Sequence, residues 1–255
     1  GKYERKSSSM KDFRQKITFI YAYENEDWST PMALANEFKK LGWIVDFVSI
    51  GSNRTGKYHD QDLQLWIQQD LDCDIALFMD WGRFTSTYLD KNLKPNTFWV
   101  QESGDDPQNF ERNYPKSERF HLTLSPDFES TTEYRRRNQD AHWWTHFADT
   151  AVQYPMDIKP EYVAVTTRGV GSSQFLDQLT YHGGGTIGNK NGFNAPQHTE
   201  FLNKGLMVVQ NSRGGEVTRG IFEGMACGKV VLCDRLDECK KLHELFIDGE
   251  DIVYY

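Results

Sequence analysis

The sequence lacks the marks of several classes of protein. Its 255 residues include four cysteines, and no two of them form a C-x-x-C pair, so neither a zinc ribbon nor a thioredoxin-type redox site is indicated. No apolar run approaches the roughly 20 residues that a helix needs to cross a bilayer, and the polar N-terminal stretch has no apolar signal-peptide core. We therefore expect reduced cysteines, no membrane span, no bound metal and a cytoplasmic location, in the host if the chain is phage-encoded.

Positive charge is also scarce over most of the chain. The formal net charge is −8, which argues against a protein dedicated to coating nucleic acid. Two segments are nevertheless basic: residues 1–16, with six Lys or Arg against two acids, and the run Arg135, Arg136 and Arg137. We expect a flexible basic arm and a solvated helix end. The alternative is that both segments contact a polyanionic acceptor such as DNA.

The first half of the chain alternates between strand and helix patterns. Short apolar runs predict strands at 17–23, 43–50, 75–79, 97–101 and 120–124. A helix is predicted from Thr30, where Pro31 suits the first helical position, and another around Leu63. The residues after 101 read as a polar loop. Asp127 is predicted to cap a helix that runs to about Arg137.

The same alternation resumes after residues 148–160, a stretch with two prolines and no helical period that we interpret as a domain linker. Strands are predicted at 162–166, 206–209, 230–233 and 251–254, and helices at 172–180, 197–204, 216–227 and 237–246. Strands that alternate with helices indicate parallel sheets covered on both faces. The sequence therefore predicts an α/β fold of two Rossmann-like, doubly wound domains, 17–150 and 151–255, with ligands in the cleft between them.

The most informative segment is 208–234, which reads as strand, polar turn, helix, glycine and strand. A helix N-terminus carries free N–H groups and a partial positive charge, which suit a diphosphate. Arg213 and Arg219 lie near this helix end and could donate to phosphate oxygens. Glu223, one turn further along, could accept hydrogen bonds from the ribose hydroxyls of a nucleotide lying along the helix.

The stretch from Arg219 to Gly228 contains Phe-Glu-Gly-Met-Ala-Cys-Gly and resembles the F-E-x-M-A-C-G signature of glycosyltransferases with the GT-B fold. Together with the flanking Asn211-Ser-Arg and Val230-Val-Leu-Cys-Asp, and with Asp105-Asp-Pro, it is similar to the spore-maturation CgeB-type family. The resemblance implies that Glu223 binds the ribose, and that Arg219 and the amides near Thr218 face the diphosphate. Many relatives carry an E-x7-E pair, but Gly215 stands in its first position here, and Glu216 is the nearest acid.

Further candidates come from the ends of other predicted strands. Arg168, in the glycine-rich turn after strand 162–166, could reach the donor phosphates. If the reaction inverts the sugar, a carboxylate must take the acceptor proton, and Asp80, Asp105 and Asp106 follow strands of the first half. No Asp-x-Asp motif follows a predicted strand, so a metal-dependent mechanism is not indicated.

We therefore predict an enzyme that moves a sugar from a nucleoside diphosphate, with a UDP-sugar favoured, to a hydroxyl acceptor. A small molecule, a protein, a glycan and a hydroxymethylated DNA base all remain open as acceptor. The alternatives are a non-catalytic nucleotide-sugar-binding module and a sugar-nucleotide epimerase of the same fold. No cofactor is expected beyond the nucleotide-sugar co-substrate.

Overall fold

The computed structural model describes residues 15–21, 30–49, 60–80, 89–166, 187–189, 195–212 and 215–255. Several predicted features lie outside these residues: the arm 1–16 except for its last two residues, the helix at 172–180, and the side chains of Arg168 and Arg213. The side chain of Asp80 also lies outside the described part of the structure, although its backbone ends a strand.

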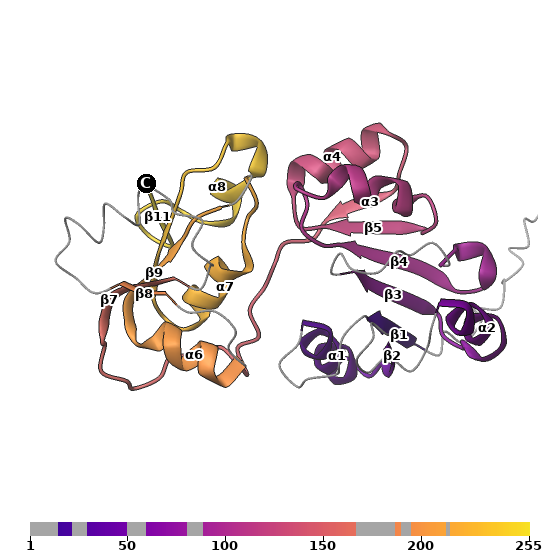
Figure 1. The fold of residues 1–255 in the computed structure, drawn as a ribbon, viewed down its shortest axis with the longest axis horizontal. Coiled ribbons are helices and arrows are strands. Elements are labelled where there is room, and N and C mark those ends of the chain that lie inside the picture. Colours follow the sequence, from indigo (N-terminus) through magenta and orange to yellow (C-terminus); the bar gives the residue numbers. More distant parts are fainter. Residues whose placement is uncertain are drawn as a thin grey trace, which may run out of the picture. The chain divides into compact units, whose positions relative to one another are not determined.

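Six strands form the first sheet, in the order β2-β1-β3-β4-β5-β6 (Figure 1). They are β1 (Lys16–Tyr21), β2 (Ile44–Ser49), β3 (Ile75–Asp80), β4 (Phe98–Ser103), β5 (Leu122–Ser125) and β6 (Ala141–Trp143). The intervening helices are α1 (Thr30–Lys40), α2 (Asp60–Asp70), the 3-10 helix η2 (Lys91–Leu93), α3 (Phe110–Ser117) and α4 (Phe128–Arg136). β1 pairs in parallel with β2 and β3, and β5 pairs in parallel with β6.

Five strands form the second sheet, in the order β11-β10-β9-β7-β8. They are β7 (Tyr162–Thr166), β8 (Ile187–Asn189), β9 (Gly205–Gln210), β10 (Val230–Cys233) and β11 (Val253–Tyr254). The helices are α6 (Ala195–Asn203), α7 (Arg219–Ala226), the 3-10 helix η3 (Glu238–Lys240) and α8 (Leu242–Leu245). Every pairing in this sheet is parallel. The predicted α/β class with two parallel sheets is therefore confirmed.

Two large apolar cores support these elements. One contains Phe78, Trp99 and Phe120, all 3% exposed or less, and lies in the first sheet and its helices. The other contains Val208 and Ile221, both fully buried, and joins α7 to the second sheet. Burial of side chains of this size contributes roughly 1.5–3 kcal/mol each, so the strands that carry them are the stable part of the fold.

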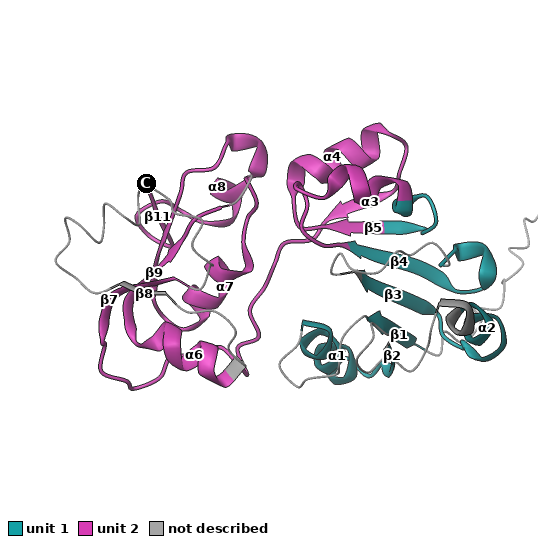
Figure 2. Ribbon diagram, in the orientation of Figure 1, with its two compact units in different colours: residues 1–102, 116–122 teal, residues 103–115, 123–255 magenta. Residues whose placement is uncertain are grey.

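The chain divides into two compact units that do not coincide with the two sheets (Figure 2). Residues 1–102 and 116–122 form one unit, and residues 103–115 and 123–255 form the other. The second unit therefore includes most of α3 and all of α4 as well as the whole second sheet. The predicted domain boundary at 150/151 stays a prediction.

Two segments differ from their predicted secondary structure. The polar loop expected after residue 101 contains α3, although Pro115 lies inside this helix. The single helix expected at 237–246 is two short ones, because Lys241 between them has a left-handed backbone with φ of 59°. The predicted cap of α4 is confirmed, since Asp127 accepts a 2.7 Å hydrogen bond from the backbone N–H of Ser130.

Candidate functional site

The clearest candidate site lies at the carboxyl end of β9, where residues 211–218 lead into α7. Thr218 is the N-cap residue of α7, but its side chain makes no capping hydrogen bond. Its hydroxyl donates instead to Oε1 of Gln210, at 3.2 Å. The N–H groups in the first turn of a helix lack intrahelical acceptors and form the positive end of the helix dipole. The cap side chain thus leaves this end of α7 suited to an anion.

Gly220 allows the side chain of Gln210 to lie against that first turn. A Cβ atom at position 220 would fall 2.5 Å from Cδ and 2.6 Å from Nε2 of Gln210. Gln210 is 1% exposed, and its Nε2 has no hydrogen-bond partner. A buried amide without a partner costs free energy. This nitrogen is therefore a donor available to an acceptor oxygen bound at the helix end.

Gly224, one turn further along α7, sets how closely the helix packs on the sheet. A Cβ atom there would lie 2.9 Å from Cγ2 of Val231 and 3.1 Å from Cβ of Val208. Glycine is thus required at the two positions, before and after Glu223, for different physical reasons. Gly220 makes room for a polar side chain, and Gly224 lets the helix approach β9 and β10.

Glu223 is held between two basic groups. Its Oε1 lies 2.8 Å from Nε of Arg219 one turn before it, and its Oε2 lies 3.8 Å from Nε2 of His198 on α6. Glu223 is 8% exposed. Burial lowers the pKa of His198, and Arg219 adds to this while Glu223 opposes it. The structure therefore brings the predicted pair Arg219 and Glu223 into direct contact, and adds a histidine that the sequence did not indicate.

Glu216 lies just before the helix in the same loop. It is 9% exposed, and its Oε1 lies 3.8 Å from Nε2 of His146, beyond hydrogen-bond distance. The His146 nitrogen is itself buried without a hydrogen-bond partner. Glu216 thus lies near the start of α7, which begins three residues later in the chain.

The loop after β9 is anchored to the end of β10. Asp234 accepts a 2.8 Å hydrogen bond from the backbone N–H of Ser212, and its other oxygen accepts from the Ser212 hydroxyl. Both residues belong to stretches that flank the helix motif in the sequence. This contact gives a physical reason for the Ser that follows β9 and the Asp that follows β10 on either side of the motif helix.

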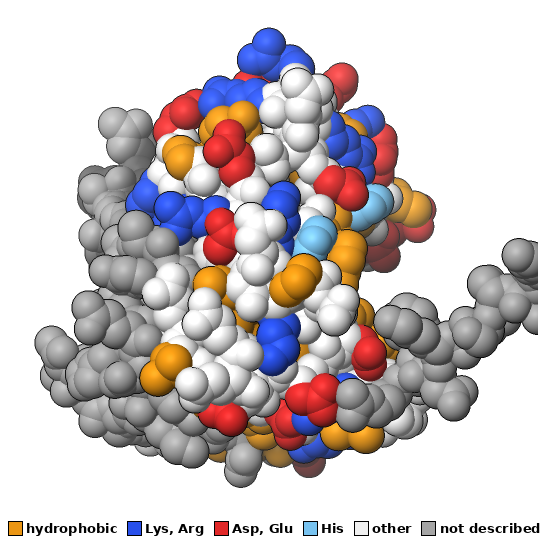
Figure 3. Space-filling view, turned by 90° about the vertical axis from the view of Figure 1, so that its right-hand side faces the viewer, with side chains coloured by type: hydrophobic (Ala, Val, Ile, Leu, Met, Phe, Trp, Pro, Cys, Tyr) orange, Lys and Arg blue, Asp and Glu red, His pale blue; other side chains and the backbone are white. Residues whose placement is uncertain are grey.

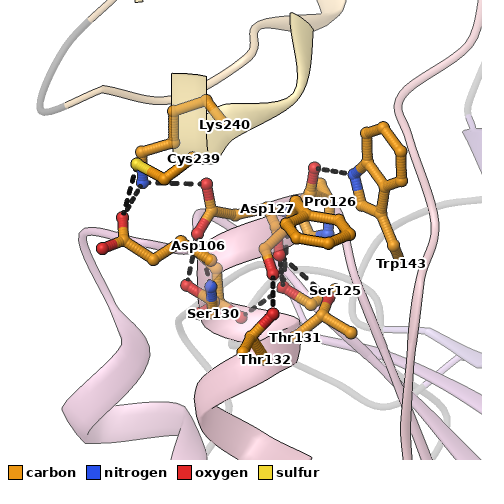
Figure 4. Close-up of polar contacts among 12 residues, drawn as sticks. Asp106, Ser125, Pro126, Asp127, Ser130, Thr131, Thr132, Trp143, Cys239 and Lys240 are labelled. Atoms are coloured by element: carbon orange, nitrogen blue, oxygen red, sulfur yellow. Dashed lines mark hydrogen bonds and ion pairs between the residues drawn. The ribbon is translucent and has the colours of Figure 1, made fainter. Parts of the chain in front are cut away.

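A second anchor comes from Lys240 in η3. Figure 4 shows its side chain directed at Asp127, the N-cap residue of α4, and Nζ lies 3.0 Å from Asp127 Oδ1. Nζ also lies 2.8 Å from Oε2 of Glu129 in the first turn of α4. Gly215, with φ of 78°, passes close to the stem of this lysine, because a Cβ there would lie 3.2 Å from Lys240 Cε. Lys240 therefore packs against the loop that precedes α7.

The predicted catalytic residue Asp106 has no exposed surface. Its Oδ2 accepts hydrogen bonds from the hydroxyls of Ser103 (2.7 Å) and Ser125 (2.9 Å), and its Oδ1 accepts from Asn113 Nδ2 (3.1 Å). Burial raises the pKa of Asp106 to about 6, although all three hydrogen bonds oppose this shift. Such a carboxyl group holds β4, β5 and α3 together, and its burial keeps it from direct contact with an acceptor in this structure.

The remaining predicted site residues are placed less fully. Asp105 is exposed next to Asp106, with φ of 58° and a 3.4 Å hydrogen bond from Asn109 Nδ2 to its Oδ2. Asp80 ends β3 in the first sheet, and its side chain is outside the described residues. Arg168 and Arg213 also lie outside them. A catalytic or binding role for these four residues stays a prediction.

The predicted basic spot on α4 is largely paired with acids. Arg136 and Arg137 both bind Glu133, at 2.6 Å from their Nε atoms, and Arg137 also lies 2.9 Å from Glu111. Arg135 donates its Nε–H to the backbone oxygen of Ala141. On the face drawn in Figure 3, Lys and Arg side chains of the described residues lie among Asp and Glu. These contacts neutralise much of the positive charge that would attract DNA.

Three site residues gave little signal in the sequence. Gln210 is a polar residue that ends an apolar strand, which is a weak indication of a site at the strand end. His198 and Lys240 lie on helices whose partners are remote in the chain, so no local spacing marks them. Among the described residues, no group of three His, Cys, Asp or Glu could hold a metal, and no helix is long and apolar enough to span a bilayer.

Comparison with known protein sequences gives one family match. Residues 168–255 match the protein family described as "Glycosyl transferase-like". None of the curated protein sequences compared with the chain matches it significantly.

Solved structures resemble almost the whole chain, each over 94% of its length. A sucrose-phosphate synthase from Thermosynechococcus elongatus is 10% identical with a TM-score of 0.59, and 86% of that chain is covered. AviGT4, a glycosyltransferase involved in avilamycin A biosynthesis, is 11% identical with a TM-score of 0.60 and 84% covered. HepE from Anabaena, solved in complex with UDP-glucose, is 14% identical with a TM-score of 0.52 and 85% covered.

At these identities the likeness to solved structures establishes the fold. The chain has the fold of the GT-B glycosyltransferases, and its residues 168–255 are similar to the family described as glycosyl transferase-like.

Proposed function

We propose that this protein transfers a sugar from a nucleoside diphosphate to a hydroxyl acceptor, with the donor bound at the N-terminus of α7. One observation carries the proposal: the uncapped helix end, the unpartnered Gln210 amide and the Arg219–Glu223 pair meet at the carboxyl end of β9. Ligands of open parallel sheets bind at this edge. The glycosyl transferase-like match over 168–255 and the GT-B fold support sugar transfer.

The proposed roles follow from the charges at the site. The diphosphate accepts hydrogen bonds from the first turn of α7 near Thr218, from Gln210 Nε2 and from Arg219. Stabilising the negative charge that develops on the diphosphate leaving group is the main electrostatic demand of the reaction. Arg213 and Arg168 are the further predicted donors to the same phosphates. Glu216 remains a candidate for binding the donor sugar.

Glu223 is proposed to bind the ribose. Two hydroxyls can share one carboxylate, and the contact with Arg219 orients that carboxylate. We propose that the nucleoside diphosphate of the donor is UDP, and the UDP-glucose complex of HepE supports this choice. The finer assignments, a CgeB-type enzyme with an acceptor-side domain at 17–150 and a donor domain at 151–255, are part of the same proposal.

The general base, if the reaction inverts, is proposed to be Asp105 or Asp80. Asp106 is fully buried, so we propose that it supports the exposed Asp105 beside it. The same burial favours one competing function, a nucleotide-sugar-binding module without catalysis. Measurement of turnover beside binding separates the two, because a module binds the donor and never releases the diphosphate.

The test is a thermal-shift screen with UDP, GDP, CDP, TDP and ADP, with and without their sugars. We expect one diphosphate to raise the melting temperature of the wild type, and the shift to disappear in Arg219→Ala and Glu223→Gln. Lys204→Ala is the control, because Lys204 follows α6 and, among the described residues, pairs with Glu161 and Glu200 and with no acid of the site. If no nucleotide shifts the wild type, the proposal fails.

A further inference from the structure

A groove of about 870 Å3 lies beside α3 and α4, and we call it the α3–α4 groove. The segment 107–112, the first turns of α4 and Cys239 line it. Its volume is within the roughly 300–1,000 Å3 typical of small-molecule sites. The candidate donor site at α7 shares none of its lining residues, so the groove is separate from that site.

The lining combines apolar rings with many hydrogen-bonding groups. Phe110 and Phe128 supply aromatic surface from opposite helices. The polar side chains are mostly acceptors or mixed donors and acceptors: the carboxylates of Glu111, Glu129 and Glu133, two amides and two hydroxyls. Arg112 is the one cation among the lining residues.

The carboxylates of this groove are fixed in place from outside it. Glu133 binds Arg136 and Arg137, and the hydrogen bonds from these arginines hold its pKa at about 2, so it is ionised at neutral pH. Glu129 binds Lys240 at 2.8 Å, and this contact lowers its pKa. None of the three cations lines the groove. The carboxylates therefore present oriented acceptor oxygens at little cost in side-chain entropy.

Oriented acceptors beside aromatic rings suit a molecule with many hydroxyl groups and apolar C–H faces. The cations beside the groove, Arg136, Arg137 and Lys240, are already paired with its carboxylates, so they are not available to the phosphates of a polyanion. We propose that the α3–α4 groove binds a neutral carbohydrate, and that this carbohydrate is the sugar acceptor. The second part rests on the proposed function; the first does not.

The transfer step then balances without a further reactant. The acceptor hydroxyl oxygen forms a bond to the anomeric carbon of the donor sugar. The bond from that carbon to the diphosphate oxygen breaks, and its electron pair leaves with the nucleoside diphosphate. The hydroxyl proton passes to a carboxylate base.

The test blocks the groove without changing its charge. Thr132 is exposed on α4 and lines the groove, and its hydroxyl donates a hydrogen bond to the backbone oxygen of Phe128. Thr132→Trp fills the groove, and Thr150→Trp places the same ring at an exposed threonine outside it. The probes are the methyl glycosides of glucose, galactose, mannose and N-acetylglucosamine, two glucose disaccharides, and duplex DNA containing 5-hydroxymethylcytosine.

Binding is measured first without donor, by saturation-transfer NMR on the full chain. We expect at least one glycoside to bind the wild type and Thr150→Trp, and to bind Thr132→Trp at least about tenfold more weakly. Absence of binding by every glycoside, or equal binding to both tryptophan variants, overturns the proposal. So does DNA binding that Thr132→Trp removes.

Release of UDP from UDP-glucose is the second readout, and it separates the two proposals. We expect the bound glycoside to accelerate UDP release in the wild type, while Thr132→Trp keeps only the slow release seen without acceptor. Glycoside binding with no UDP binding or release supports the groove and contradicts the proposed function. UDP release that DNA accelerates and no glycoside does overturns the carbohydrate assignment and leaves the proposed function standing.

Discussion

Lys240 and Asp127 form an ion pair that is almost closed to solvent. Their side chains are 7% and 1% exposed, and Nζ lies 3.0 Å from Oδ1. Asp127 uses its other oxygen to cap α4, through the backbone N–H and the hydroxyl of Ser130 (Figure 4). One carboxylate thus fixes a helix start and receives a cation from η3, more than 100 residues later in the chain.

We expect Lys240→Met to lower the free energy of unfolding by about 3 kcal/mol, because it leaves Asp127 buried without its cation. Burial alone would lower the pKa of Lys240, but the hydrogen bonds that it donates to Glu129 and Asp127 outweigh this effect and raise the pKa. The lysine is therefore charged at neutral pH. Urea denaturation of both proteins at pH 7 measures the difference.

Lys241→Met is the matched control. Lys241 pairs with the exposed Glu244 one turn away and lies 5.4 Å from the centroid of the Phe128 ring, and exposed contacts of these kinds contribute about 0.5 kcal/mol each. Equal losses in the two variants would show that the burial of the Asp127 pair has no energetic consequence.

Gly220→Ala is expected to weaken donor binding at α7. The added Cβ would displace the Gln210 side chain, whose Cδ it would approach to 2.5 Å. We expect the affinity for the stabilising diphosphate to fall about tenfold, measured by titration calorimetry. The double variant Gly220→Ala with Gln210→Ala removes the clash. If the clash is the cause, the double variant should be no weaker than Gln210→Ala alone.

Asp234→Ala is expected to release the loop after β9. It removes two hydrogen bonds to Ser212, one of them to the backbone, and charge-assisted bonds contribute about 2 kcal/mol. We expect weaker diphosphate binding together with this loss of stability. Asp237→Ala is the control, because its exposed side chain makes no capping bond to η3. Unchanged diphosphate affinity in Asp234→Ala would show that the loop keeps its conformation without the anchor.

Asp106→Asn tests the buried carboxyl through pH. The pKa of Asp106 is about 6 in the folded protein and about 4 when unfolded, a difference of about 3 kcal/mol. Between these values the folded state keeps a proton that the unfolded state has lost. The wild type therefore loses stability as pH rises from 4 to 6, and the asparagine variant lacks this loss.

We expect the stability of wild type minus that of Asp106→Asn to fall by up to about 3 kcal/mol between pH 4 and pH 7. Asp105→Asn is the control, because Asp105 is exposed and asparagine tolerates its positive φ. Its difference from the wild type should not show this fall. A constant difference for Asp106→Asn would mean that the buried carboxyl titrates normally.

The strands of both sheets were predictable from the sequence because a buried parallel strand needs a run of apolar residues. The predicted strands at 75–79, 162–166 and 230–233 match β3, β7 and β10 to within one residue. The cap at Asp127 was predictable for a similar local reason, since a capping side chain acts on a backbone N–H three residues away.

α3 could not be predicted in this way. Its eight residues include a proline and few apolar side chains, so local preference opposes a helix. Contacts from elsewhere support it: Asn113 donates to Ser103, Asp106 and the backbone oxygen of Gly104, and Phe110 packs on Tyr134. The break at Lys241 is similar, because Lys240 before it is bound to α4.

The sequence by itself determined the α/β class, the alternation of elements and the position of the motif helix, because these depend on apolar spacing and on residues close in the chain. The tertiary structure alone decided that Asp106 is buried, that Glu223 meets His198, and that Asp127 receives Lys240. Each of these facts depends on which side chain from a remote part of the sequence packs against a charged group. Hydrogen bonds and ion pairs act over a few ångströms in space, whatever the separation of the partners along the chain.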